Sequence, residues 1–257
     1  MKNFLFELCA ENVDAAQAAE SGGADRIELC SQLSIGGVTP DIDLIAAAIQ
    51  ALSIPVHVLI RPRGGNFVYS TDEFTLMQRQ IEQALRAGAA GIAVGVLLPD
   101  GRVDVDRSRE LVELGRPMSV TFHRGFDETK NLTEALEAVI QTGADCLLTS
   151  GGASDVLAGA ESIARLHGQA GERLNVMAGG GLKLTNLAEV VRRTGVSYLH
   201  GSLTRKPSDR DETNGKPAGN GHLAVSRQSM LEADVRESIR LLSYEVVARE
   251  SATQTAG

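Results

Sequence analysis

The feature that most constrains the fold of this chain is an alternation of short apolar runs with longer stretches of helical periodicity. Eight apolar runs, many of them rich in β-branched residues, are predicted to be strands: residues 4–9, 26–30, 56–62, 91–96, 118–123, 146–151, 174–180 and 197–202. The stretches between them begin with Asp, Ser, Thr or Asn, and several stop at Gly. These residues are favoured at the beginning of a helix and just beyond its end. The pattern therefore predicts repeated βα units.

Eight strands at this spacing predict a parallel (β/α)8 barrel of the TIM type, as one domain over residues 1–250. The chain of 257 residues lies in the size range of one such barrel. An open doubly wound sheet is the alternative, because the number of strands does not show that the sheet closes. Residues 205–221 are polar, contain Gly and Pro, and are predicted to be a long mobile loop. A last helix over 229–250 should close the ring, and 251–257 should be a disordered tail.

Composition excludes several classes of function. The 25 basic and 33 acidic residues give a net charge of −8, and no basic cluster stands out, so we expect no nucleic-acid partner. No apolar stretch approaches the roughly 18 residues that a membrane span needs, and the N-terminus lacks a signal-peptide pattern. There are only three cysteines, and a disulfide framework needs a larger and even number. We therefore expect a reduced, soluble, cytoplasmic protein without a membrane partner.

Polar residues crowd the ends of the predicted strands, where the active sites of this fold lie. Glu7 and Cys9 are two residues apart, as are Glu28 and Cys30, so each pair should point to one face while the intervening Leu points to the other. The same spacing relates Arg61 to Arg63 and Thr121 to His123. A structural ion pair is the alternative for any single residue. For the cluster as a whole, function is favoured, because buried charge is costly.

Each part of this cluster suggests a role. Glu7 or Glu28 is a candidate general acid or base, and His123 is a candidate proton carrier at neutral pH. The side chains of Arg61, Arg63, Arg124 and Thr149 are candidate ligands of an anionic substrate group, which a guanidinium fork matches well. A glycine-rich turn adds backbone N–H groups that could approach a phosphate at Gly179, Gly180 and Gly181.

The thiols of Cys9 and Cys30 admit two interpretations. Inward cysteines on adjacent strands could hold a soft ion such as Cu(I), which accepts low coordination numbers from thiolates. Free cysteine is also among the most buried residue types and packs as a small apolar side chain. From the chemistry alone packing is favoured, and Cys146 is interpreted as a core residue.

Several longer motifs together resemble a known family. The segments GGADRIELC, GGVTP, PVHVLIRPRGGNFVYS, VTFHRGFD, LLTSGG and MAGGGL are similar, in this order, to the signature segments of the CutC family of copper homeostasis proteins. The resemblance runs from about residue 4 to about residue 203. It implies a TIM-barrel-like cytosolic homo-oligomer, with a dimer favoured, that takes part in copper handling. It also implies Cys9 and Cys30 as the ligands of Cu(I).

Two hypotheses about function follow. The first is a copper homeostasis protein whose partner is a copper ion, bound as Cu(I). The second is a metal-independent barrel enzyme that acts on a small phosphorylated or carboxylated metabolite, with Glu and His as acid and base and Arg61 as the anion clamp. A barrel that keeps a pocket but has no activity is a third interpretation.

Overall fold

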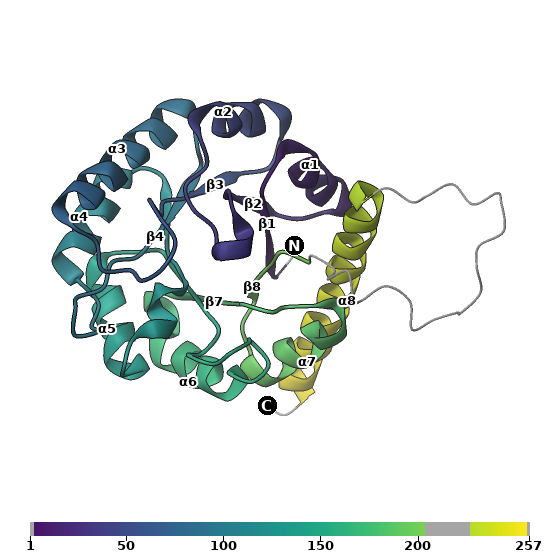
Figure 1. The fold of residues 1–257 in the computed structure, drawn as a ribbon. Coiled ribbons are helices and arrows are strands. Elements are labelled where there is room, and N and C mark those ends of the chain that lie inside the picture. Colours follow the sequence, from purple (N-terminus) through teal and green to yellow (C-terminus); the bar gives the residue numbers. More distant parts are fainter. Residues whose placement is uncertain (1–2, 204–226, 256–257) are drawn as a thin grey trace, which may run out of the picture.

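Eight parallel strands form a closed barrel in this protein (Figure 1). The structure is a computed structural model that describes residues 3–203 and 227–255. The strands are β1 (Leu5–Ala10), β2 (Arg26–Leu29), β3 (Val56–Leu59), β4 (Gly91–Val94), β5 (Ser119–Phe122), β6 (Cys146–Thr149), β7 (Asn175–Gly179) and β8 (Tyr198–Gly201). Because β1 pairs with β8 as well as with β2, the sheet has no open edge. The predicted (β/α)8 barrel is confirmed, and the open doubly wound sheet is excluded.

The helices form a ring around the barrel (Figure 1). They are α1 (Val13–Gly22), α2 (Ile42–Ala51), α3 (Thr71–Ala87), α4 (Val105–Gly115), α5 (Leu132–Thr142), α6 (Ala160–Ala170), α7 (Leu184–Thr194) and α8 (Arg227–Thr255). Three short 3-10 helices complete the described elements: η1 (Leu33–Ile35), η2 (Arg124–Glu128) and η3 (Gly171–Arg173). No helix of the described residues is long and apolar enough to cross a membrane.

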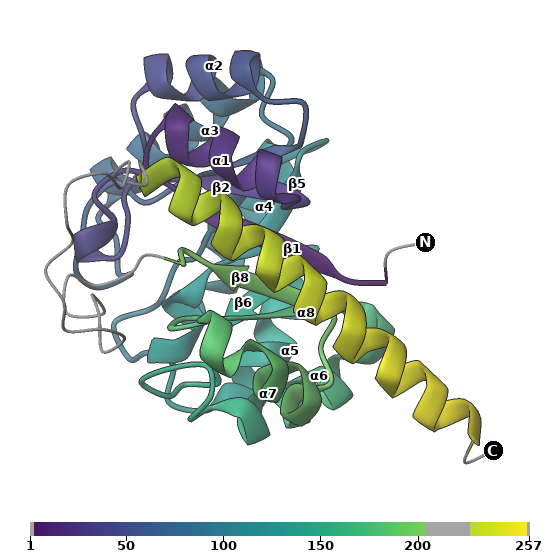
Figure 2. The same ribbon diagram turned by 90° about the vertical axis from the view of Figure 1, so that its right-hand side faces the viewer.

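The last helix completes the ring by packing against α1 and α7 (Figure 2). It is longer than predicted. Residues 251–255 continue α8 instead of forming a disordered tail, which is consistent with a segment that contains neither Gly nor Pro to stop a helix. The predicted mobile loop at 205–221 lies outside the described residues.

Successive residues of each strand point alternately toward the surrounding helices and into the barrel. Phe6, Leu8, Ile27 and Leu29 are fully buried in the large apolar core that the helices and strands share. The alternate residues of the same strands have their side chains inside the barrel, where Glu7 and Glu28 are buried. The apolar core therefore holds the ring of helices on the barrel, and the barrel interior holds the charged side chains.

Candidate functional site

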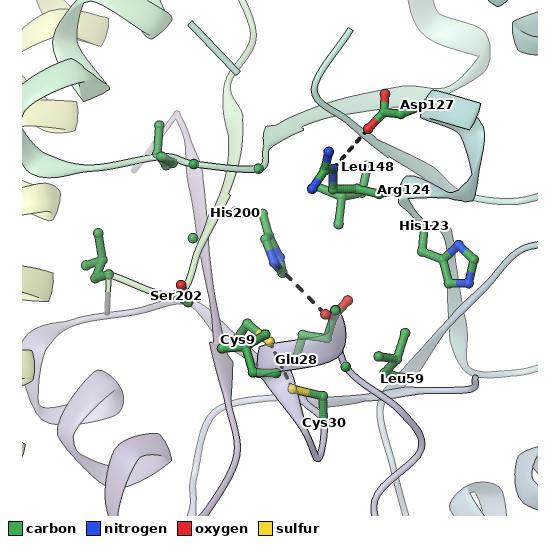
Figure 3. A pocket seen from close by; sticks show the side chains of 18 of the residues that line it. Cys9, Glu28, Cys30, Leu59, His123, Arg124, Asp127, Leu148, His200 and Ser202 are labelled. Atoms are coloured by element: carbon green, nitrogen blue, oxygen red, sulfur yellow. Dashed lines mark hydrogen bonds and ion pairs between the residues drawn. The ribbon is translucent and has the colours of Figure 1, made fainter. Parts of the chain in front are cut away.

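A pocket of about 890 Å³ is lined by residues at the C-terminal ends of the strands and in the loops that follow them (Figure 3). Most of the predicted site residues line it: Cys9, Glu28, Cys30, Arg61, His123, Arg124, Gly180 and Gly181. In Figure 3 the two thiols and Glu28 lie on one side, Arg124 and Asp127 lie on the other, and His200 lies between them. These residues, predicted to gather at the C-terminal ends of the strands, line one pocket in the structure.

The two thiols are close neighbours at the pocket wall. Cys9 is the next-to-last residue of β1, and Cys30 directly follows β2. Their Sγ atoms lie 3.2 Å apart, and both cysteines are free. The hydrogen bond between the two thiols, together with burial, raises the pKa of Cys9 well above its usual value. In the absence of a ligand, the Cys9 thiol is therefore protonated at neutral pH.

The barrel interior beneath the pocket contains a charged network centred on Glu7. Glu7 is opposite Arg26 on β2 and His200 on β8, because β1 pairs with both strands. Arg26 donates from Nε to Glu7 Oε2, and His200 Nδ1 lies 2.7 Å from Glu7 Oε1. Glu28 continues the network toward the pocket, with Oε1 4.0 Å from His200 Nε2. Glu7 itself does not line the pocket.

The two carboxyl groups differ in acidity. Burial raises the pKa of Glu7, but the attraction of Arg26 and His200 outweighs it and lowers the pKa to about 2. At Glu28, burial is the largest effect and the pKa is raised. The pKa of His200 is raised as well, because the attraction of the two carboxylates exceeds the opposing effect of burial. A pair of carboxyl groups with separated pKa values is typical of acid/base sites, and here Glu28 is the member that reaches the pocket.

His123 is neutral at physiological pH. Burial lowers its pKa to about 3, and the nearby charge of Arg61 acts in the same direction. Its Nδ1 accepts a hydrogen bond from the backbone N–H of Gly125 at 3.1 Å, so the ring proton sits on Nε2. The predicted role as a proton carrier at neutral pH does not fit this pKa. His123 can instead donate a hydrogen bond.

Arg61 lies in the pocket wall, and within the described residues its guanidinium forms no ion pair with a carboxylate. Its Nη1 donates to the carbonyls of Gly37 at 2.8 Å and Ile35 at 3.2 Å, and Nη2 donates to that of Gly65 at 2.7 Å. The guanidinium also lies 4.8 Å from the centre of the Phe67 ring. Since backbone carbonyls carry no net charge, Arg61 contributes positive charge to this wall.

The opposite side of the pocket offers further groups for an anion. Arg124 donates to Asp127 from Nε at 2.9 Å and to the Ser150 hydroxyl from Nη2 at 3.0 Å. Gly180 has a φ of +94°, and a Cβ there would come within 2.8 Å of the Arg124 guanidinium. The positive φ of this turn favours glycine, and the missing Cβ leaves room for the Arg124 guanidinium. Lys183, just before α7, adds a further cation to the lining of the pocket.

Three of the predicted anion-binding residues do not line the pocket. Arg63 is held by Glu73, with 2.6 Å between Nε and Oε1, and by the carbonyls of Asn66 and Val68. The Thr149 hydroxyl is fully buried and donates to Asp127. Gly179 packs against His200 beneath the pocket. These three residues support the loops around the site.

Three lining residues, His200, Asp127 and Lys183, were not among the predicted site residues. His200 was detectable, because its place in the eighth predicted strand gives it the parity of an inward side chain. Asp127 lies in η2 and Lys183 lies just before α7, and strand parity gives the direction of neither side chain. Cys146 is buried in the interior, as predicted.

Comparison with known proteins shows the family. The sequence profile of the CutC family matches residues 4–205. A CutC family protein of Mesorhizobium japonicum is 42% identical over 196 residues, which cover 76% of each chain. The human copper homeostasis protein cutC homolog is 41% identical over 233 residues, covering 90% of this chain and 85% of its own.

Solved structures agree with this result. A crystal structure of CutC from Streptococcus agalactiae has a TM-score of 0.74 at 30% identity and covers 78% of this chain and 100% of its own. An aldolase, QR15, has a TM-score of 0.57 at 16% identity and covers 79% of this chain and 91% of its own, which shows a shared fold alone. The chain belongs to the CutC family, whose relatives include copper homeostasis proteins.

Proposed function

We propose that this protein binds Cu(I) through the thiolates of Cys9 and Cys30. The observation that carries the proposal is the distance of 3.2 Å between two free Sγ atoms at the wall of an open pocket. Cu(I) is a soft ion that prefers thiolate ligands and accepts two or three of them. Membership of the CutC family supports a role in copper homeostasis.

Binding of Cu(I) at this site should release protons. Because the pKa of Cys9 is raised by its hydrogen bond with Cys30 and by burial, the ion must displace a thiol proton before it can bind. The apparent affinity for Cu(I) should therefore fall as the pH falls. The cationic Arg61 on the pocket wall would offset part of the negative charge of two thiolates around a monovalent ion.

Anaerobic titration with Cu(I) against a competing chelator tests this proposal. The wild-type protein should bind one equivalent, and the Cys9→Ser/Cys30→Ser double variant should bind none. Cys146→Ser is the matched control, because this thiol is equally buried but does not line the pocket. Unchanged binding by the double variant would contradict the proposal.

A specific observation favours a second candidate function for the metal-free protein. Glu28, whose pKa is raised by burial, lines a pocket that also contains Arg61, Arg124 and Lys183. A buried carboxyl group with a raised pKa, in a pocket that also holds several cations, suits acid/base chemistry on a small phosphorylated or carboxylated metabolite. A Cu(I) site made of two thiolates would not need Glu28, Arg124 or Lys183.

A thermal-shift screen of chelator-treated protein with phosphorylated and carboxylated metabolites tests the second candidate. Ligands that stabilise the wild type should stabilise Arg124→Gln less. Arg102→Gln is the matched control, since Arg102 also pairs with an aspartate, Asp100, but outside the pocket. Equal shifts for both variants would count against an anion site at Arg124.

The cytoplasmic location remains a prediction from composition and from the family resemblance, and the homodimer remains a prediction from the resemblance. Light scattering coupled to size-exclusion chromatography measures the mass of the particle in solution. A mass near twice the 27.2 kDa of the chain would support the dimer, and a mass near 27.2 kDa would contradict it.

A further inference from the structure

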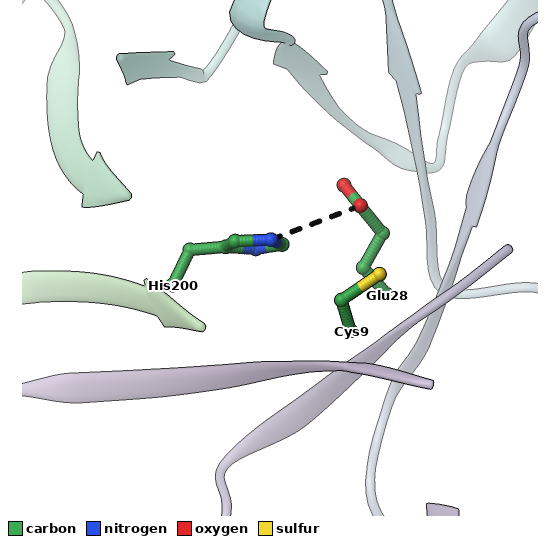
Figure 4. Close-up of side chains that lie close together, drawn as sticks. All are labelled: Cys9, Glu28 and His200. Carbon is green, nitrogen blue, oxygen red and sulfur yellow. Dashed lines mark ion pairs between the residues drawn. The ribbon is translucent and has the colours of Figure 1, made fainter. Parts of the chain in front are cut away.

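Three strands present three different metal-binding atoms to one another at the base of the pocket. Cys9 on β1 offers Sγ, Glu28 on β2 offers a carboxylate oxygen, and His200 on β8 offers a ring nitrogen (Figure 4). These atoms all lie within 4.8 Å of one another. We infer that Cys9, Glu28 and His200 form a second metal site, which binds a divalent ion of borderline softness such as Zn²⁺.

The tautomer of His200 suits this role. Its Nδ1 lies 2.7 Å from Glu7 Oε1, an oxygen of the carboxylate that also pairs with Arg26, so Nδ1 is the ring nitrogen that donates to Glu7. When the ring is neutral, Nε2 keeps its lone pair, and Nε2 is the atom directed at Glu28 in Figure 4. Histidine ligands of protein-bound zinc usually donate their other ring N–H to a carboxylate or a carbonyl.

Glu7 is itself held in place. Arg26 donates to Glu7 Oε2, while Oε1 accepts from His200, so both oxygens of the carboxylate are used. Glu7 does not line the pocket and is not a ligand. It is a positioning residue, which orients the ring of His200 and makes Nε2 a better donor to a metal.

The distances need only a small contraction. Zinc binds nitrogen and oxygen at about 2.0–2.2 Å and sulfur at about 2.3 Å, so ligand atoms in a tetrahedral site lie roughly 3.3–3.7 Å apart. Here His200 Nε2 and Glu28 Oε1 are 4.0 Å apart, and no pair in the set exceeds 4.8 Å. Changes in side-chain torsion angles can supply the difference. The pocket leaves a fourth coordination position for water or a substrate oxygen, as in catalytic zinc sites.

The charges also balance when a divalent ion is present. The ion would offset the negative charges of Glu28 and of the Cys9 thiolate, while Arg26 offsets Glu7. All four side chains are buried, so an unbalanced charge among them would be costly. A monovalent ion would leave one negative charge uncompensated. The cluster therefore favours a divalent ion over Cu(I).

This site is distinct from the proposed Cu(I) site but shares one ligand with it. Cys30 is a ligand only in the thiolate pair, and Glu28 and His200 are ligands only in the mixed set. Because both sites use Cys9, the two ions should exclude each other. Glu28 likewise has a different role in each state of the protein. It is a metal ligand when the divalent ion is bound and a candidate general acid when the ion is absent.

Titration of the full-length, reduced protein with Co²⁺ tests the inference, since cobalt replaces zinc and reports its ligands by absorption. The wild type should show a thiolate-to-cobalt charge-transfer band and the strong visible bands of a tetrahedral site, and Zn²⁺ should displace both. His200→Asn should lose these bands or bind Co²⁺ at least tenfold more weakly. Asn can keep the hydrogen bond to Glu7 that Nδ1 makes, and it lacks only the Nε2 ligand.

Four further variants separate the inference from the copper proposal and from a general structural effect. Cys30→Ser should abolish Cu(I) binding and keep the cobalt bands, whereas His200→Asn should do the reverse. Cys146→Ser is the thiol control and should keep both. Glu7→Gln should weaken Co²⁺ binding by about 10- to 100-fold without changing the tetrahedral spectrum. Circular dichroism shows whether each variant is folded. If His200→Asn is unfolded, Glu28→Gln serves as the ligand variant in its place.

The inference is overturned by any of three results. These are a wild-type protein without a cobalt–thiolate band, a band that His200→Asn and Glu28→Gln leave unchanged, or a band that Cys30→Ser removes. The last result would place cobalt on the thiolate pair. Loss of Cu(I) binding in Cys30→Ser alongside absent cobalt bands would leave the copper proposal intact.

Discussion

At the scale of single residues, Glu7 illustrates how the barrel interior can contain a buried carboxylate. Glu7 is 1% exposed, and Arg26 beside it is 7% exposed. Each would be costly alone, because removing a charge from water requires several kcal/mol. Together with His200 they use both oxygens of the carboxylate. The stability of the barrel should therefore be more sensitive to the loss of one partner than to the loss of both.

Arg26→Met tests this expectation. The variant leaves the Glu7 carboxylate buried without its guanidinium, and we expect a loss of about 3–5 kcal/mol in the free energy of unfolding. The Glu7→Gln/Arg26→Met double variant should lose less than the sum of the two single variants, as measured by urea unfolding. Arg173→Met, which breaks an exposed pair with Glu137, is the control and should have a much smaller effect. Additive losses would contradict coupling between Glu7 and Arg26.

His123 should make the protein less stable in acid. Its pKa is about 3 in the folded state, below the usual 6.5 of a histidine, so the unfolded state binds the proton more tightly. The contribution of the neutral ring is complete above pH 6.5, falls as the pH falls below that value, and is lost near pH 3. Between pH 6.5 and 5 the loss should be on the order of 2 kcal/mol.

His123→Asn should remove this part of the pH dependence. Asn offers an oxygen that can accept the Gly125 N–H in place of Nδ1, but it does not titrate. Urea unfolding of both proteins between pH 7 and 5 provides the comparison. We expect the variant to have the flatter curve, and parallel curves would show that His123 is not buried in its neutral form.

The sequence predicted which strand side chains point into the barrel, but it did not predict which residues of neighbouring strands lie opposite one another. The inward positions of Glu7, Cys9, Glu28 and Cys30 follow from alternation along each strand, and all four side chains are where alternation places them. The partner of Glu7 depends on which residues of the neighbouring strands lie opposite it. The register of β1 and β2 places Arg26 beside Glu7, although Arg26 was not predicted to belong to the charged cluster.

At the scale of secondary-structure elements, local signals predicted the helices better than the ends of the strands. Side chains at Asn12, Asp41, Ser70 and Asn131 cap helices, as their positions in the sequence indicate. The predicted strand 56–62 was too long, since β3 ends at Leu59. Arg61 and Arg63 therefore belong to a loop, and parity cannot give their directions. This is why Arg61 lines the pocket and Arg63 does not.

The packing of α8 on α1 depends on Gly22, the last residue of α1. A Cβ at this position would lie 2.6 Å from the Cβ of Val235 and 2.7 Å from the carbonyl oxygen of Glu232. Gly22→Ala should therefore push α8 away and reduce the free energy of unfolding by about 1–3 kcal/mol. Gly168→Ala in α6 is the matched control, because no atom lies within 4 Å of its added Cβ. That variant should gain about 0.5–1 kcal/mol from helix propensity, and thermal unfolding measures both. Equal effects would contradict a tight α1–α8 contact.

At the scale of the whole molecule, closure of the barrel brings distant parts of the chain together. Glu7 lies opposite His200, 193 residues later, only because β1 pairs with β8. The repeated βα pattern predicted the closed barrel, and closure then determines which side chains meet. Only one of the two proposed metal sites depends on this closure. The thiolate pair joins β1 to the residue after β2, whereas the mixed site joins β1, β2 and β8.

The two ions should therefore protect different parts of the barrel against hydrogen exchange. Either ion, at a free concentration of 100 times its dissociation constant, should stabilise the folded state by about 2.7 kcal/mol. Amides that exchange only through global unfolding should then slow equally with both ions. Amides of β8 that exchange through local opening at the junction with β1 should slow with Zn²⁺ alone, because only the mixed site holds His200.

Mass-spectrometric hydrogen exchange at matched stabilisation measures the difference, with His200→Asn as the control in which the Zn²⁺ effect on β8 disappears. Equal protection of β8 by Zn²⁺ and Cu(I) would show that both ions occupy the same ligands.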